Sequence, residues 1–303
     1  MDRRVKTRHV SVFVEIARKR SLKQAAEVLN LTQPAVSKTL AELEGILKTT
    51  LLLRNRSGVS LTPAGEVFLH FAGQSLAALN QGINGVAQLQ AGTQGQLSIG
   101  VLPSVAARLM PRAVAGFREM APDVVLTLSD GSHDGLIARL RNGELDLLVG
   151  RLGAPESMQG LSFTQLYTEI VDFVVRPGHP LLEQAGLESL PDWPVIYPKK
   201  NAAIRPLVDR FLIANGIGVL PQRIESVSGA FGREFTRNSD AVWVISAGVV
   251  AREVAEGRLA RLDIDASLTR GPIGISMVPG RASSPAVSMM QTALRDTVAE
   301  LAL

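Results

Sequence analysis

The spacing of apolar residues near the start of the chain predicts a helix. Val10, Phe13, Val14 and Ala17 recur at i, i+3, i+4 and i+7, which is the repeat of one helix face over residues 7–19. Polar and charged residues fill most of the positions between them. We therefore expect an amphipathic helix that packs on whatever follows it.

Two further short helices follow, with only a few residues between them. Ser21 is a good N-cap for the first, and Thr32 for the second. Pro34 lies in the first turn of the second, where a missing N–H is tolerated. The inner faces are apolar, with Leu22, Ala25, Ala26 and Leu29 on the first and Val36, Leu40, Leu43 and Leu47 on the second. This tight pairing predicts a helix-turn-helix.

The outer face of the last of these helices carries the candidate chemistry. Gln33, Ser37 and Ala41 share it, with Pro34 and Lys38 beside them. The major groove of DNA admits one helix, glutamine can pair with adenine, and lysine can bind guanine or phosphate. The helix N-terminus adds partial positive charge for phosphate. The alternative is an ordinary three-helix bundle whose third helix has a solvated face.

A short hairpin is predicted next. Residues 51–53 and 59–61 have the character of strands, and Arg56-Ser57-Gly58 is typical of a turn. Such a wing would bring Arg54 and Arg56 to a DNA backbone. Thr62 then caps a long helix that Pro63 opens.

These residues resemble the LysR-type transcriptional regulators. The matching positions are Ser21-Leu22, Ala25-Ala26, Leu29, Thr32-Gln33-Pro34-Ala35-Val36-Ser37, Leu43-Glu44, Leu51-Leu52 with Arg54, and Leu61-Thr62 with Gly65. The resulting candidate DNA-binding set is Ser21, Thr32, Gln33, Pro34, Ser37, Lys38, Arg54 and Arg56. Lys48 departs from the family, which usually has glycine there, so the third helix must end without the residue that favours left-handed backbone.

The long helix is expected to run from Pro63 to about residue 89. Its apolar residues are spaced 3-4-3-4-3, as in a heptad seam, and are Leu69, Ala72, Leu76, Leu79, Ile83 and Val86. We expect the seam to pair with a second subunit, as in LysR-like regulators; packing against its own domain is the alternative. Residues 91–96 are small and polar and predict a hinge.

The remaining residues alternate strands and helices, which predicts α/β layers with largely parallel sheets in two subdomains. The expected strands are 96–102, 124–130, 145–150, 169–177, 194–198, 222–228, 240–246, 259–264 and 272–279, and the expected helices are 103–120, 134–142, 203–215, 229–236, 248–256 and a last one opening at 284–285. In the LysR family this body resembles periplasmic solute-binding proteins, with a ligand cleft between two lobes.

The expected fold is thus α/β with an all-α, winged head. A winged helix-turn-helix DNA-binding domain spans 1–62, a dimerising linker helix spans 63–90 and an effector-binding domain spans 91–303. Within the last, lobe I covers about 95–167 and 269–303, and lobe II covers about 168–268.

Ligands of open α/β sheets lie at the carboxyl ends of strands and against helix N-termini. That rule selects Ser104, Ser132, His133, Arg151, Lys200, Asn201, Ala202 and Ser246, and the resemblance implies that the same loops line an effector cleft. Hydroxyls, helix N-termini and cations favour an anion such as a carboxylate. Structural alternatives are N-caps for Ser104 and Ser132, an inter-lobe ion pair for Arg151, and exposed positions for Lys200 and His133.

Residues 204–216 and 240–253 look like the pca-type regulators of protocatechuate catabolism, which respond to carboxylated ring-cleavage metabolites. Regulators of sugar uptake share much of the pattern. Ala247 stands where the pca-type subgroup is expected to have a polar residue. The resemblance implies an activator that binds a partly palindromic DNA operator as a homodimer or homotetramer, with RNA polymerase as a further partner.

Composition and charge further restrict the class of protein. Residues 1–62 hold 12 lysines and arginines against 5 acidic residues, whereas the rest holds 20 against 23, so a polyanion partner is expected for the head only. The chain has no cysteine. No apolar run of about 18 residues and no export signal are found, so we expect a cytoplasmic protein without a membrane partner.

Enzymatic motifs are not found in the sequence. Nucleophile-elbow, zincin and Walker A patterns are lacking, and residues 216–221 do not form a dinucleotide fingerprint. Four scattered histidines do not predict a metal site. We therefore expect no enzyme, no cofactor and no metal; a solute-binding module without DNA function is the remaining alternative.

Overall fold

The computed structural model describes residues 4–55, 58–91, 95–184, 186–280 and 284–303. The chain divides into two compact units. The first contains residues 1–92 together with 141–144, and the second contains 93–140 and 145–303.

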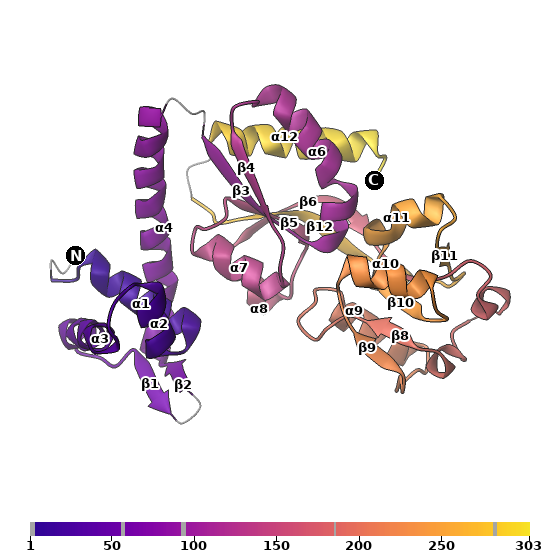
Figure 1. Cartoon of the computed structure of the whole chain (residues 1–303), viewed down its shortest axis with the longest axis horizontal. Coiled ribbons are helices and arrows are strands. Elements are labelled where there is room, and N and C mark those ends of the chain that lie inside the picture. Colours follow the sequence, from indigo (N-terminus) through magenta and orange to yellow (C-terminus); the bar gives the residue numbers. More distant parts are fainter. Residues whose placement is uncertain (1–3, 56–57, 92–94, 185, 281–283) are drawn as a thin grey trace. The chain divides into compact units, whose positions relative to one another are not determined.

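Three helices and a hairpin form the head, and each was predicted from the sequence. The helices are α1 (Thr7–Lys19), α2 (Leu22–Val28) and α3 (Gln33–Leu47), and strands β1 (Leu52–Asn55) and β2 (Gly58–Leu61) form the wing (Figure 1). Their apolar faces bury Phe13, Ile16, Ala25 and Leu43 completely. The long helix α4 (Pro63–Ala91) joins this core through Phe68, whose ring lies edge-on to that of Phe13 at 5.2 Å.

Side-chain caps define the helix-turn-helix. Ser21 Oγ accepts from the amide of Gln24, and Thr32 Oγ1 accepts from the amide of Ala35. The third helix ends at Lys48, which itself adopts left-handed backbone with φ 53°. The helix therefore ends as it would with the family's glycine, although a side chain in this conformation costs about 1–2 kcal/mol.

The wing is fixed to the helices by hydrogen bonds to Glu44 and by a close approach at Gly65. Glu44 Oε1 accepts from the amides of Leu51, at 2.7 Å, and Leu52, at 3.2 Å. At the start of α4, Thr62 Oγ1 accepts from the amide of Gly65, and a Cβ at position 65 would lie 2.1 Å from the carbonyl oxygen of Leu51. The strand and the helix can approach this closely only with glycine at position 65.

Only part of the predicted α4 seam is left for a partner. Its first three members, Leu69, Ala72 and Leu76, pack against the head's own core, which corrects the prediction that the whole seam faces another subunit. Leu79 and Ile83 remain 46% and 58% exposed, and the side chain of Val86 lies outside the described part of the structure.

Two five-stranded sheets form the second unit, and each belongs to one lobe. Lobe I has the order β4-β3-β5-β12-β6, with β3 (Gln96–Val101), β4 (Val125–Ser129), β5 (Leu147–Arg151), β6 (Ser162–Glu169) and β12 (Gly271–Met277). Lobe II has the order β11-β7-β10-β8-β9, with β7 (Val171–Val175), β8 (Val195–Tyr197), β9 (Arg223–Glu225), β10 (Val242–Ser246) and β11 (Ala260–Arg261). The chain crosses between the sheets at Ile170 and returns at Arg270.

Both sheets are mixed, so the prediction of largely parallel sheets was wrong. The β3–β4, β3–β5, β8–β9 and β8–β10 pairs are parallel, whereas β12 runs antiparallel to β5 and β6, and β7 runs antiparallel to β10 and β11. The antiparallel strands lie next to the two crossings, because a strand that enters one lobe directly from the other has no crossover helix.

Helices cover both sheets. They are α5 (Pro103–Arg108), α6 (Met110–Met120), α7 (His133–Arg141), α8 (Pro155–Met158), α9 (Arg205–Ala214), α10 (Gly229–Arg237), α11 (Ala247–Ala255) and α12 (Pro285–Glu300). The single helix expected over 103–120 is two helices that meet at Leu109, since Pro111 cannot donate to the carbonyl one turn earlier. In lobe I, α6 and α12 lie side by side on one face of the sheet, with α7 on the other (Figure 1).

Candidate functional site

The outer face of α3 presents polar side chains and a cation to solvent. Thr32, Gln33, Pro34 and Lys38 are exposed, and Ser37 is half-buried. The first turn of α3 contains no acidic residue, so the partial positive charge of the helix N-terminus is not neutralised there. Gln33 and Lys38 are thus free to reach base edges or phosphates of a duplex.

A side-chain hydrogen bond also links the wing to the outer face of α3. Arg54 on β1 donates from its guanidinium to Ser37 Oγ at 2.9 Å. Ser21 belongs to the base of the motif, where its hydroxyl caps α2. Arg56 lies outside the described residues. The described members of the predicted set therefore form one surface around Gln33, Ser37 and Arg54, with Ser21 in a capping role.

A buried histidine holds α3 against α1, and sequence reasoning did not identify it. His9 is 2% exposed, and its Nε2 lies 3.3 Å from Glu42 Oε2. Its Nδ1 accepts from the amide of Lys6, and Arg8 also donates to Glu42 at 3.1 Å. A lone histidine carries no pattern that would have shown this role; here it positions α3 rather than contacting a ligand.

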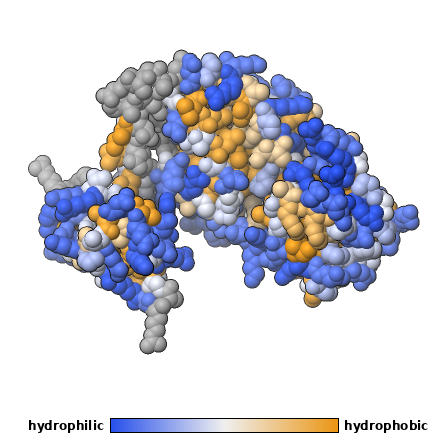
Figure 2. Space-filling view, in the orientation of Figure 1, coloured by the Kyte–Doolittle hydropathy of each residue, from blue (hydrophilic) through white to orange (hydrophobic). Residues whose placement is uncertain are grey.

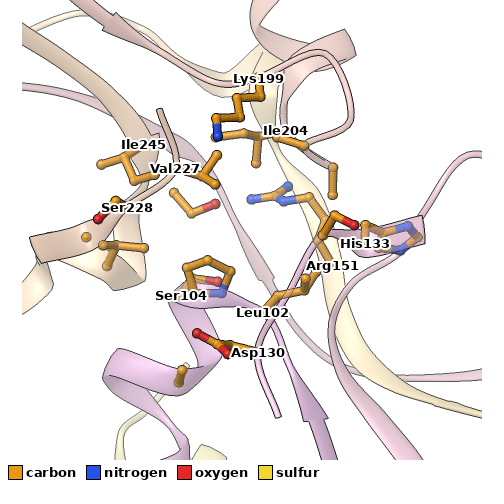
Figure 3. Close-up of a pocket in the computed structure, with 18 of the residues that line it drawn as sticks. Leu102, Ser104, Asp130, His133, Arg151, Lys199, Ile204, Val227, Ser228 and Ile245 are labelled. Atoms are coloured by element: carbon orange, nitrogen blue, oxygen red, sulfur yellow. The ribbon is translucent and has the colours of Figure 1, made fainter. Parts of the chain in front are cut away.

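A cavity of about 670 Å³ opens between the two lobes of the second unit (Figure 3). It lies at the carboxyl ends of strands from both sheets, where the strand-end rule places ligands. The lining comes from the start of α5, the segment 130–133, the end of β5, the loop 199–204, the segment 226–230 and the end of β10. Its volume suits a small metabolite.

Most residues predicted for the ligand line this cavity. They are Ser104, Ser132, His133, Arg151, Asn201, Ala202 and Ser246. Lys200 does not line it, and the cation from that loop is Lys199 (Figure 3). The loop turns at this point, with the amide of Ala202 bonded to the carbonyl of Lys199, so adjacent lysines point in different directions. The strand-end rule selects the loop but does not distinguish neighbours within it.

Sequence reasoning also missed Asp130, Ser226 and Ser228, which line the same cavity. Asp130 follows β4, while the serines follow β9 and precede α10. The same strand-end rule, applied to every strand, would have selected them. Ser228 Oγ caps α10 by accepting from the amide of Phe231 at 3.3 Å.

Arg151 lies at the crossing between the lobes and points into the cavity (Figure 3). It is 5% exposed, and it donates to the carbonyl oxygens of Glu169, at 3.1 Å, and Thr269, at 3.4 Å. Its nearest carboxylate oxygen, Glu169 Oε2, is 3.7 Å away. Both carbonyls belong to the two crossing segments, so this side chain joins the ligand cavity to the hinge.

Glu169, 4% exposed, is at least as buried as Arg151. Its Oε1 accepts from the amide of Gly248 at 3.0 Å, and its side chain also hydrogen-bonds to Ser104. Burial raises the pKa of Glu169, and the charge of Arg151 is the largest influence that opposes this rise. In this poorly solvated site, the charge of each side chain therefore stabilises the charged form of the other.

The remaining polar groups of the cavity differ in charge. Burial lowers the pKa of His133 below its usual value, so its imidazole is neutral at pH 7 and can both donate and accept. The hydroxyl of Ser246 does not cap α11 and is free for a ligand. Among the described lining residues, Asp130 is the one carboxylate, against the two cations Arg151 and Lys199. The cavity therefore favours an anion that also carries hydrogen-bonding groups.

Two other properties hold for the described part of the chain. It contains no cluster of three acidic or histidine side chains able to hold a metal ion. None of its helices is long and apolar enough to cross a bilayer.

Both units of the chain match known protein families. Residues 7–66 match the family model described as bacterial regulatory helix-turn-helix protein, lysR family, and residues 90–299 match the LysR substrate binding domain. The HTH-type transcriptional regulator PcaQ of Agrobacterium fabrum is 45% identical over 303 residues, which cover 99% of this chain and 97% of PcaQ.

Solved structures of full length share the fold. A full-length OxyR variant of Pseudomonas aeruginosa has a TM-score of 0.62 at 23% identity, covering 96% of this chain and 95% of that one. Full-length CbnR complexed with its target DNA has a TM-score of 0.59 at 19% identity, covering 97% of this chain and 100% of CbnR.

Proposed function

The chain belongs to the family of LysR-type transcriptional regulators, and from this premise we propose that it activates an aromatic catabolic operon of the protocatechuate type in response to a small carboxylated metabolite. The similarity to PcaQ supports the choice of subgroup. The head would bind the operator, and the cavity between the lobes would bind the effector.

The observation that carries this proposal is the charge of the cavity. Arg151 is held by the two crossing segments of the hinge, and Lys199 extends from the loop of the other lobe. A carboxylate between these cations would attract both lobes to one ligand. Neutral His133, the free hydroxyl of Ser246 and carboxylate Asp130 would then recognise further polar groups of the same molecule.

The effector would act through the hinge. A ligand that draws Arg151 and Lys199 together favours the closed arrangement of the lobes, and it can shift that equilibrium only by its differential affinity for the closed form. Because Arg151 also donates to the carbonyls of Glu169 and Thr269, ligand binding acts directly on both crossing segments.

Oligomerisation is assigned to α4. Val67, Phe71, Leu79 and Ile83 are exposed by 46% to 64% and lie in one row of positions four residues apart, in which Ser75 is the polar member. Apolar side chains in such a row are typical of a helix that pairs with another helix. Two heads paired in this way would read a two-fold related operator, as a dimer or within a tetramer.

A thermal-shift screen of the full-length protein tests the effector class. Protocatechuate and carboxylated ring-cleavage products should raise the unfolding temperature, while sugars of similar size should not. Stabilisation by a sugar and by none of the acids would favour a regulator of sugar uptake instead.

Substitution Gln33→Ala tests the DNA-binding half. Loss of a base contact should weaken specific binding by about 1–3 kcal/mol and relax the choice of operator. Gln24→Ala, a change on the neighbouring helix α2, is the matched control. Unchanged discrimination between operator and competitor DNA in a gel shift would reject the role of Gln33.

A further inference from the structure

A second cavity, of about 630 Å³, lies beside the contact between α5 and α11. Helix α5 belongs to lobe I and follows β3, while α11 belongs to lobe II and follows β10. Val249 lines both this cavity and the cleft described above. The second cavity thus adjoins the cleft at Val249, is otherwise lined by different residues, and takes its walls from both lobes.

Its charged lining is dominated by arginine. The charged residues are Arg108 and Arg112 from the α5–α6 pair, Arg233 from α10, and Arg252 and Glu253 from α11. Glu253 is thus the one acidic residue among the described lining residues, against four guanidinium groups. The space-filling view shows hydrophilic surface over α11 (Figure 2).

Nearby carboxylates form ion pairs with two of these four arginines. Arg233 donates to Glu253 at 2.5 Å and to the carbonyl of Val249 at 2.6 Å, and Arg252 pairs with Glu256 at 2.7 Å. Within the described residues, Arg108 and Arg112 have neither a hydrogen bond nor an ion pair. Arg108 is half-buried and Arg112 is exposed, and both line this cavity, so an anion bound there would reduce the repulsion between their guanidinium groups.

Arginine also indicates the chemistry of the occupant. Its planar fork matches two oxygen atoms of a carboxylate or phosphate group, and charge-assisted bonds of this kind are the strong ones. Two such forks, from Arg108 and Arg112, fit an anion with several oxygen atoms and more than one negative charge. The cavity volume is that of a small-molecule site.

The position of Arg108 connects this cavity to the hinge. Burial raises the pKa of Glu169 and of Asp172, and the positive charge of Arg108 opposes that rise in both. Glu169 ends the last strand of lobe I before the crossing, and Asp172 lies in the first strand of lobe II. An anion that draws Arg108 away would change the electrostatic balance at the crossing itself.

We propose that the cavity between α5–α6 and α11 binds a second small polyanion, carrying phosphate or several carboxylates, which joins the two lobes at a site distinct from the cleft. Bound there, the anion stabilises one relative orientation of the lobes and so changes the affinity of the cleft. By linkage, an occupied cleft changes the affinity of this site by the same factor.

The test is a titration of the full-length protein with pyrophosphate, inorganic phosphate and citrate by thermal shift and calorimetry. Low millimolar anion, at ionic strength matched with chloride, keeps the general stabilisation by excluded anions small. Arg112→Ala and Arg252→Ala remove exposed cations of the cavity. Arg210→Ala removes an exposed arginine of α9, outside the cavity, and Lys199→Ala removes a cation of the cleft.

The expected result is saturable binding that Arg112→Ala weakens by about tenfold or more and that Arg252→Ala, whose guanidinium is already paired with Glu256, weakens less, while Arg210→Ala and Lys199→Ala leave it unchanged. Preference for pyrophosphate over citrate would identify a phosphate compound, and the reverse a polycarboxylate. No saturable binding in the wild type, or binding lost in Lys199→Ala and retained in Arg112→Ala, would overturn the proposal. Neither DNA nor an aromatic acid enters this test, so its outcome is independent of the proposed function.

Discussion

Replacing Arg151 by alanine should destabilise the effector-binding unit strongly, because Arg151 compensates a buried carboxylate. The substitution removes its bonds to the carbonyls of Glu169 and Thr269 and leaves Glu169, itself 4% exposed, without its positive neighbour at 3.7 Å. Two unit charges at about this distance attract by about 4 kcal/mol at an effective dielectric constant of about 20. Breaking one partner of a buried pair typically costs about 3–5 kcal/mol.

Protonation limits this loss. An unfolded glutamate has a pKa of about 4.3, so keeping Glu169 neutral at pH 7 costs at most about 4 kcal/mol, at about 1.4 kcal/mol per pH unit. At pH 5 the same limit is about 1 kcal/mol. In the variant the folded state therefore holds a proton that the unfolded state has lost, and its stability must fall as pH rises through this window. We expect a deficit of about 3–4 kcal/mol at pH 7 that shrinks on acidification.

Urea unfolding followed by tryptophan fluorescence measures this deficit, since both tryptophans of the chain, Trp193 and Trp243, report on lobe II. The double variant Arg151→Ala with Glu169→Gln is the matched control. It should recover most of the loss, because the uncompensated charge is gone. A single variant within about 1 kcal/mol of the wild type at pH 7, or a deficit equal at pH 5 and pH 7, would refute the compensation that we infer.

Three further predictions concern the first unit. Gly65→Ala should destabilise the head by about 1–3 kcal/mol because its Cβ would lie 2.1 Å from the carbonyl of Leu51; thermal unfolding followed by circular dichroism measures this, and an unshifted transition contradicts it. Arg54→Ala should weaken binding of all DNA sequences alike and reduce the salt slope of log affinity by about 1, as expected of a phosphate contact; an unaltered slope in salt-dependent binding would reject that role. Ile83→Asp should lower the apparent mass in light scattering, and an oligomer that survives this change would place the contact elsewhere.

The head could be predicted almost completely from its sequence, because its helices and hairpin depend on residues that lie close together in the chain. The spacing of apolar residues predicted the helices, and the capping residues Ser21 and Thr32 predicted where α2 and α3 begin. The left-handed backbone of Lys48 could not be predicted, because lysine rarely adopts that conformation. The capping role of His9 toward the amide of Lys6 was equally hidden.

The body was less predictable, because its sheets form between distant segments. Strand β6 (Ser162–Glu169) was missed, since its exposed polar residues weaken the apolar pattern of a strand. Antiparallel pairing of β12 with β5 and β6 depends on where the chain crosses between lobes, which no local pattern encodes. For the same reason the sequence identified the loops of the cleft but chose Lys200 where the cavity has Lys199.

The adjacent lysines provide the most direct test of the central claim, that a carboxylate held between the lobes is the signal. Isothermal titration with the most stabilising acid from the screen should show that Lys199→Ala weakens binding by about tenfold or more, while Lys200→Ala leaves it unchanged. Equal affinity in all three proteins, or a loss confined to Lys200→Ala, would contradict the account.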